Sequence, residues 1–328
     1  MRVLVTGGAG FIGGHIARGL TGQGHAVTVL DNLVPYYDVG IKQHNLEAIE
    51  HTATQHDTTV EFVDGSITNE ELLSELVRDT DVVYHQAAQA GVRKSLDEPK
   101  QVNASNVTGT INVLEAARQH DIDRVVVASS SSVYGKPEYL PYDEAHPTTP
   151  VSPYGVSKLA TEQYARVYSE VFDLPTVSLR YFTVYGPRMR PNMAMTNFIS
   201  RCLHGESPEI YGDGSKTRDF TYVDDVVRVN TQLLTDDRAD GEILNIGSTD
   251  NIDILTLAET VRDAIDPSLD IVFTDAIAGE AEHTHADVSK ARDLLDYEPT
   301  VDIREGVASF IDWYEANMDW YDPLVRAS

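Results

Sequence analysis

The sequence has one cysteine, Cys202, among its 328 residues, so no disulfide within the chain holds the fold. No apolar run approaches the ~20 residues that span a bilayer. The first residues, MRVLVTGGAG, lack the regions of a signal peptide. Basic residues are few: the chain has 25 Lys and Arg against 52 Asp and Glu, which gives a formal net charge of −27. Nucleic acid and anionic membranes attract basic surfaces, so we expect neither as a partner and expect a cytoplasmic protein.

Lysine is especially scarce, with seven residues against eighteen arginines. An acidic surface of this kind repels itself in dilute buffer, and concentrated salt screens the repulsion. We interpret the acid excess as adaptation to a salt-rich cytoplasm, and we expect stability and activity to rise with salt. Binding to a cationic partner is the alternative, but no single acidic cluster supports it.

Short apolar runs alternate with helical patterns over residues 1–180, and 41% hydrophobic residues supply a core. The runs are Val3–Thr6, Ala26–Leu30, Val60–Val63, Val82–Tyr84, Arg124–Ala128 and Thr176–Leu179, and the clearest helical patterns are Glu70–Val77, Val102–Gln119 and Tyr154–Phe172. This alternation predicts an α/β fold, a doubly wound parallel sheet of the Rossmann type covered by helices on both faces.

The pattern breaks after residue 180, where prolines and the turn Gly212–Gly214 interrupt it. We therefore expect residues 181–328 to form a smaller, mixed α/β region. Phe220–Leu234 again has the pattern of a strand followed by a helix. An open alternative is therefore that residues 220–247 return to the first domain.

Three glycines, Gly7, Gly10 and Gly13, follow the first apolar run and open a helical pattern. Glycines permit a tight turn and let the backbone approach a pyrophosphate at a helix N-terminus, where free N–H groups favour an anion. Asp31 ends the next apolar run, where a carboxylate accepts ribose hydroxyls and repels a 2′-phosphate. The segment predicts that residues 1–180 bind NAD rather than NADP. A glycine-rich connector followed by a solvated Asp is the alternative.

Tyr154 and Lys158 lie four residues apart on a predicted helix and so share one face. A tyrosine with a pKa near ~10 is a poor base at neutral pH, but an adjacent ammonium and an oxidised nicotinamide lower that pKa. The pair therefore predicts a base for a hydroxyl proton. Ser129–Ser132 end another apolar run, at the edge of a parallel sheet where ligands bind. A tyrosine packed on a lysine stem and a polar turn are the alternatives.

These motifs, with the segment Leu179–Pro187, resemble the extended short-chain dehydrogenase/reductases of the nucleotide-sugar epimerase and dehydratase type. The resemblance runs from residue 1 to about residue 315. It implies a homodimer joined through helices near 102–119 and 154–172, and no metal. By resemblance the cofactor-binding residues are Gly7, Gly10, Phe11, Ile12, Gly13, Asp31, Asn32, Ser66, Ile67, Ala87, Ala88, Gln89, Asn106, Tyr154, Lys158 and Tyr181. Ser66 departs from the family, which usually has Asp there.

The resemblance assigns Ser130, Tyr154 and Lys158 as the catalytic residues of a 4-epimerase. Tyr154 takes the proton of the sugar O4, Ser130 orients or relays it, and the C4 hydride passes to NAD and returns to the other face. The related 4,6-dehydratases carry Asp and Glu at the positions of Ser131 and Ser132, and UDP-glucuronate decarboxylases carry Glu at that of Ser132. This chain lacks those acids, so we expect neither activity.

The substrate predicted by resemblance is a UDP-sugar bound by residues 181–328 and by the serine segment. UDP-glucuronate is slightly favoured over UDP-glucose, because UDP-galactose 4-epimerases usually have Asn at the position of Thr183. Small neutral hydroxyls also hold a carboxylate without assisting loss of CO2. The predicted substrate residues are Arg93, Ser131, Ser132, Thr183, Arg190, Arg218 and Glu280. The family's second diphosphate arginine is replaced by Ile277, with Arg188 and Arg190 as candidate substitutes.

Two other functions remain open: an NAD-dependent sugar dehydrogenase and a non-catalytic nucleotide-sugar-binding protein. The pair His283 and His285 suggests a metal, but a solvated strand is the favoured interpretation. Cys202 is expected in the core. The aromatic residues Trp313, Tyr314 and Trp320 are expected to pack.

Overall fold

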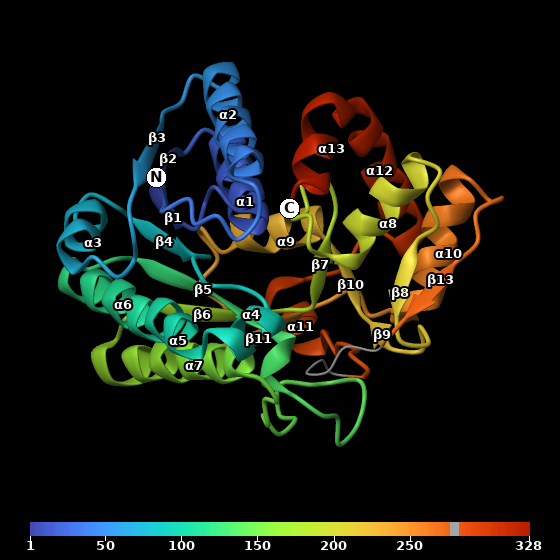
Figure 1. Cartoon of the computed structure of the whole chain (residues 1–328). Helices are drawn as coiled ribbons and strands as arrows, with labels where there is room; N and C mark the ends of the chain where they lie inside the picture. Colours follow the sequence, from blue (N-terminus) through green and yellow to red (C-terminus); the bar gives the residue numbers. More distant parts are fainter. Residues whose placement is uncertain (276–281) are drawn as a thin grey trace.

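The structure, a computed structural model, describes residues 1–275 and 282–328. Its centre is a seven-stranded parallel sheet with strand order β11-β6-β5-β4-β1-β2-β3 (Figure 1). The strands are β1 (Arg2–Thr6), β2 (Ala26–Asp31), β3 (Val60–Asp64), β4 (Val82–His85), β5 (Arg124–Ser130), β6 (Thr176–Tyr181) and β11 (Ile243–Ile246). The order reverses between β1 and β4, and the crevice at such a reversal is where open α/β sheets bind ligands.

The strands carry apolar side chains on both faces, which helices must cover. One face packs against α1 (Phe11–Gly22) and α9 (Val223–Gln232), with α2 (Val39–Gln55) beside α1. The other packs against α3 (Glu70–Val77), α6 (Gly109–Gln119) and α7 (Pro153–Phe172). The predicted doubly wound sheet is confirmed. β11 is its edge strand, paired with β6, and lies beyond residue 180.

A second core lies in the C-terminal part, to the right in Figure 1. Its helices are α8 (Ala194–Leu203), α10 (Ile254–Ile265), α12 (Ile303–Ala316) and α13 (Met318–Arg326), with α11 (Ser289–Leu295) packed near β11. Its strands form three pairs: β7 (Thr183–Tyr185) with β10 (Phe220–Tyr222), β9 (Thr217–Arg218) with β12 (Ile252–Asp253), and β8 (Glu209–Tyr211) with β13 (Val272–Thr274). Cys202 is buried in this core, as expected.

Two helices differ from the sequence prediction. The expected helix Val102–Gln119 begins earlier and has three parts: α5 (Pro99–Asn103), a π-helical segment η1 (Ala104–Thr108) and α6. π-Helical turns are frequent at functional sites, and this one contains Asn106. The helix α2 was not anticipated, because its apolar stripe is short and interrupted by polar residues.

Two short helices complete the fold: α4 (Val92–Asp97) follows β4, and the 3-10 turn η2 (Ser131–Val133) follows β5. Among the described residues, no helix is both long and apolar enough to cross a membrane.

Candidate active site

The glycine turn between β1 and α1 is packed too tightly for larger side chains. Gly7 has a φ of +69°, and a Cβ there would lie 2.7 Å from the backbone of Ala87. A Cβ on Gly13 would lie 2.3 Å from the carbonyl oxygen of Gly7. The turn therefore leads directly into the N-terminus of α1, where Phe11 and Ile12 form the first turn. This is the backbone cradle that a dinucleotide pyrophosphate needs.

Asp31, at the end of β2, is buried and has a cationic partner that the sequence did not indicate. Its Oδ1 accepts hydrogen bonds from Lys42 Nζ at 3.1 Å and from the backbone N–H of Leu33 at 2.9 Å. Its Oδ2 accepts from the N–H of Ala9 at 3.3 Å. A carboxylate offers about four acceptor positions, and these three bonds leave a position on Oδ2 for a ribose hydroxyl. Asn32, next in the chain, is exposed.

The loop after β4 is held by Asn106 from the π-helical segment. The Asn106 side chain accepts from the N–H of Gln89 at 2.7 Å, donates to its carbonyl at 3.2 Å, and donates to Ser157 Oγ at 2.9 Å. The loop's Ala87 N–H donates to Thr6 Oγ1 at 3.3 Å, beside the glycine turn. Ala87, Ala88 and Gln89 thus lie at the switch point between β1 and β4.

The remaining predicted cofactor residues have polar partners of their own. Ser66 bonds to Thr68, at 2.8 Å between the two hydroxyl oxygens, and Ile67 packs below it as a buried side chain. Tyr181 is buried, and its hydroxyl donates to Asn230 Oδ1 at 3.2 Å. Its side chain would therefore form part of the wall of the cofactor site. Ser66 and Tyr181 remain predicted contacts.

Tyr154 lies in the first turn of α7, against the end of β5. Ser152 caps this helix by accepting from the N–H of Gly155 at 3.1 Å. A Cβ on Gly155 would lie 2.5 Å from the carbonyl oxygen of Ser132, so only glycine permits this approach. The approach places Ser130 close enough to Tyr154 for its hydroxyl to act on the pKa of the phenol. The structure therefore unites the tyrosine and the serine that the sequence predicted as catalytic.

Burial raises the pKa of Tyr154, while the Ser130 hydrogen bond and the charge of Arg190 act to lower it. The sequence prediction of a lowered pKa includes the charge of an oxidised nicotinamide, so it stays a prediction. Lys158 lies on the same face of α7, but its Nζ donates to the carbonyl of Ala128 at 2.6 Å. Burial lowers the pKa of Lys158 to about 8, and Glu162 opposes this shift.

Arg190 belongs to this site, and Arg188 does not. The Arg190 guanidinium donates to the Tyr36 hydroxyl at 3.3 Å and lies 5.6 Å from the centre of its ring. Arg188 instead lies between two tryptophans, Trp313 and Trp320, at 5.6 Å from each ring, and donates to the carbonyl of His44 at 3.0 Å. The alternative that Arg188 contacts a diphosphate is therefore wrong. The expected packing role of the C-terminal aromatics is confirmed.

The other predicted substrate residues that the structure describes lie on different elements. Ser131 and Ser132 form the η2 turn beside Ser130, with Ser132 Oγ accepting from Ser130 Oγ at 3.2 Å, and Thr183 begins β7 after β6. Arg93, on α4, lies over the Tyr211 ring at 5.4 Å from its centre.

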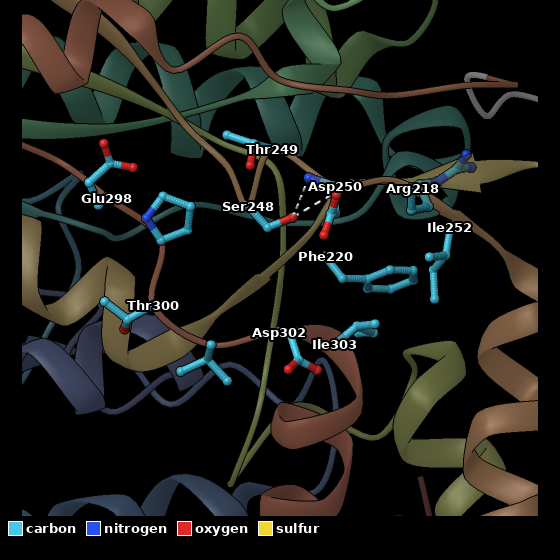
Figure 2. A pocket seen from close by; sticks show the side chains of 12 residues that line it. Arg218, Phe220, Ser248, Thr249, Asp250, Ile252, Glu298, Thr300, Asp302 and Ile303 are labelled. Atoms are coloured by element: carbon cyan, nitrogen blue, oxygen red, sulfur yellow. Dashed lines mark hydrogen bonds between the residues drawn. The ribbon is translucent and has the colours of Figure 1, made fainter.

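Arg218 lines a separate pocket of about 320 Å³ whose lining includes the carboxylates of Asp250, Glu298 and Asp302. Figure 2 shows its guanidinium turned away from the other lining side chains, and it donates to the carbonyls of Thr217 at 2.8 Å and Glu282 at 3.3 Å. Three carboxylates disfavour an anionic ligand in that pocket. The predicted contact between Arg218 and the diphosphate of the substrate stays a prediction.

Comparisons with known proteins agree with this geometry. The sequence profile of the NAD dependent epimerase/dehydratase family matches residues 3–247. The UDP-glucuronate 4-epimerase of Thermodesulfobacterium geofontis is 35% identical over 320 residues, which cover 96% of this chain and 97% of that protein. The chain belongs to the NAD dependent epimerase/dehydratase family.

Two solved structures extend the likeness to the whole fold. The UDP-glucuronic acid 4-epimerase of Bacillus cereus, crystallised with UDP-glucuronic acid and NAD, has a TM-score of 0.89 and 36% identity, covering 96% of this chain and 99% of its own. The UDP-glucose 4-epimerase of Thermotoga maritima, crystallised with UDP-glucose, has a TM-score of 0.89 and 30% identity, covering 97% and 100%. The fold of the family is therefore complete in this chain.

Two family positions, Ile277 and Glu280, lie outside the described residues, so their predicted roles remain predictions. The two histidines considered as metal ligands have other hydrogen-bond partners. A ring nitrogen of His283 lies 3.1 Å from Thr217 Oγ1, and a ring nitrogen of His285 lies 2.6 Å from the carbonyl oxygen of Thr249. Within residues 1–275 and 282–328, no group of three potential metal ligands occurs.

The Lys42–Asp31 pair predicts a large stability loss when the cation is removed. Lys42→Met leaves a carboxylate in a site where both side chains are at most 10% exposed, and breaking a buried pair costs about 3 kcal/mol in the free energy of unfolding. The matched control is Lys94→Met, because Lys94 pairs at 2.6 Å with a Glu98 side chain that is 42% exposed, and exposed pairs are worth less than ~1 kcal/mol. Urea unfolding measures both. Equal losses would contradict the account of Asp31.

Proposed function

We propose that this protein is an NAD-dependent 4-epimerase of a UDP-sugar, with UDP-glucuronate as the favoured substrate. The observation that carries the proposal is the position of Tyr154 near Ser130 at the carboxyl end of β5, beside the switch point of the sheet. An epimerase needs a base at a sugar hydroxyl next to a dinucleotide site. Both parts of the site come together here, and the family membership supports them.

The glycine turn, Asp31 and the loop after β4 are the residues that would hold NAD, since the turn excludes a Cβ at Gly7 and Gly13. When bound, NAD supplies the acceptor and donor for the C4 hydride. Tyr154 takes the proton of O4 as the C4–H bond breaks, and Ser130 orients that hydroxyl. The resulting 4-keto sugar presents its other face after turning in the site. Tyr154 then returns the proton, so the net reaction inverts C4.

The charges around Tyr154 favour a phenolate only when cations are near. Burial raises its pKa, and Arg190 is a protein cation that lowers it. The positive charge of an oxidised nicotinamide would act in the same direction. The phenolate of Tyr154 is therefore proposed to form most readily when NAD is in place.

The serine segment supports a uronate substrate. Ser131 and Ser132, next to Ser130, and Thr183 at the start of β7 offer neutral hydroxyls, and these would bind a carboxylate without a charged acid that would assist loss of CO2 from a 4-keto uronate. The UDP-glucuronate 4-epimerases among the relatives support the same choice. UDP-glucose is the second candidate, because the Thermotoga maritima epimerase crystallised with it shares the fold at 30% identity.

Product analysis with UDP-glucuronate, UDP-glucose and their N-acetylated analogues tests the proposal. We expect each 4-epimer without accumulation of NADH, with kcat/KM highest for UDP-glucuronate. The Tyr154→Phe variant should lose about 10³-fold in kcat, because it removes the base, and should still bind the nucleotide sugar. An unchanged kcat in Tyr154→Phe would contradict the mechanism. An inert UDP-glucuronate beside an active UDP-glucose would contradict the substrate preference. Released NADH would favour a dehydrogenase instead.

We further propose that two copies associate through α7. Val156, Val167 and Val171 recur along one side of this helix with exposed fractions of 54%, 37% and 63%. Scattered exposed apolar residues are ordinary, but an aligned stripe marks an interface.

Light scattering tests this association. We expect a dimer for the wild type and a monomer for Val171→Glu, because a charge in the interface is costly. The control Val272→Glu, at a residue 40% exposed on β13, should remain dimeric. A monomeric wild type would contradict the proposal.

We also propose that the acidic surface is an adaptation to a salt-rich cytoplasm.

A further inference from the structure

Glu162 is a carboxylate with no exposed surface, one helical turn after Lys158 on α7. Arg180 of β6 donates to both its oxygens, with Nε to Oε1 at 2.9 Å and Nη2 to Oε2 at 2.8 Å. The hydroxyl of Ser129, at the end of β5, also donates to Oε1. The carboxylate is therefore fixed from two neighbouring strands.

The network continues from Arg180 across the sheet. Its Nη1 donates to the Tyr134 hydroxyl at 2.9 Å, and its guanidinium lies 4.8 Å from the centre of the Tyr134 ring. Tyr134 in turn donates to Asn245 Oδ1 of β11 at 2.7 Å. The chain of contacts thus ties α7 to β5, β6 and β11 at the end of the sheet that carries the site. Its members have little freedom to rearrange.

Stability alone does not account for this pair. Removing two charges from water costs several kcal/mol each, and replacing a buried ion pair by apolar groups is often neutral or stabilising. Glu162 instead lies one helical turn from the catalytic lysine, and the two side chains reach neighbouring residues of β5: Lys158 Nζ donates to the carbonyl of Ala128, and Glu162 accepts from Ser129. A neutral lysine offers no positive charge to a Tyr154 phenolate.

We propose that Glu162 is a positioning residue that keeps the Lys158 ammonium charged at working pH, with Arg180 and Ser129 holding its carboxylate in place. The proposal deepens the proposed function, on which its catalytic consequence rests. Glu162 touches neither substrate nor cofactor in this role and acts through Lys158.

The other ionisable groups around the pair agree with this assignment. From β4, His85 is buried, and burial together with the charge of Lys158 lowers its pKa to about 3, so it is neutral. On α7 itself, Tyr154 is neutral because burial raises its pKa. The carboxyl of Glu144, after η2, faces Arg180, and burial raises its pKa. Glu162 is thus the negative charge that acts on Lys158, whose pKa burial lowers to about 8.

The sign of the effect follows directly. An anion beside an ammonium raises the pKa of the ammonium, so removing the anion lowers it. Glu162→Gln should therefore move the titration of Lys158 downward by about one unit. The alkaline limb of kcat should move by the same amount, because Lys158 loses its proton earlier.

Two readouts test the proposal in the full-length protein. The first is an NMR titration of 15Nζ-labelled lysine, in which seven lysines give few signals and a Lys158→Arg variant identifies that of Lys158. The second is the pH profile of kcat with UDP-glucuronate. Glu162→Asp, which keeps the charge, should restore most of both shifts. Because the titration needs no turnover, it stands even if the proposed substrate is wrong.

The matched control is Asp240→Asn. Asp240 pairs with Arg124 at the opposite end of β5, at 2.9 Å between Oδ2 and Nη2, so its loss should lower stability without moving either readout. If Glu162→Gln does not fold, the double variant Glu162→Gln/Arg180→Met removes both charges and leaves no buried guanidinium unpaired; its Lys158 titration should still fall. An unmoved titration in a folded Glu162 variant, or an equal shift in Asp240→Asn, would overturn the proposal.

Discussion

The close approach of the first turn of α7 to the end of β5 determines the geometry of the whole site. It is possible because Gly155 has no Cβ to meet the carbonyl of Ser132. From this contact the helix carries Tyr154 to Ser130, Lys158 to the carbonyl of Ala128, and Glu162 to Ser129. Three side chains, spaced four residues apart on one face of α7, thus meet three consecutive residues at the end of β5. A shift of α7 would disturb all three contacts together.

The second constraint is electrostatic. The site removes its base and its lysine from water, which makes both harder to ionise. Two buried carboxylates nearby are held by cations, Asp31 by Lys42 on the cofactor side and Glu162 by Arg180 behind the catalytic lysine. The surface is strongly acidic, with a net charge of −27, yet basic groups such as Lys158 and Arg190 gather at the site. An anionic substrate requires this local reversal of sign.

Local sequence patterns predicted the parts of the protein that short-range physics decides. Whereas the role of Ser130 came from the family resemblance, the glycine spacing at Gly7, Gly10 and Gly13 and the parallel sheet each follow from residues close together in sequence. The partners of Asp31 and Glu162 did not, because Lys42 and Arg180 lie on other elements and only folding joins them. For Asp31, the one available signal was Lys42, a lysine within the buried face of α2. The π-helical segment at Asn106 also depends on tertiary bonds, to Gln89 and Ser157. For Arg188, sequence proximity to Arg190 was misleading, because a positive φ of 65° turns it toward two tryptophans.

We propose that the Ser130–Tyr154 pair serves a reaction confined to C4 of the sugar. The decisive experiment is turnover of UDP-[4-²H]glucuronate in ordinary water. The 4-epimer should retain its deuterium at C4, with no solvent hydrogen gained at C4 or C5. Loss of the label to water, or solvent hydrogen at C5, would contradict it, because the inversion would then proceed by proton exchange at carbon.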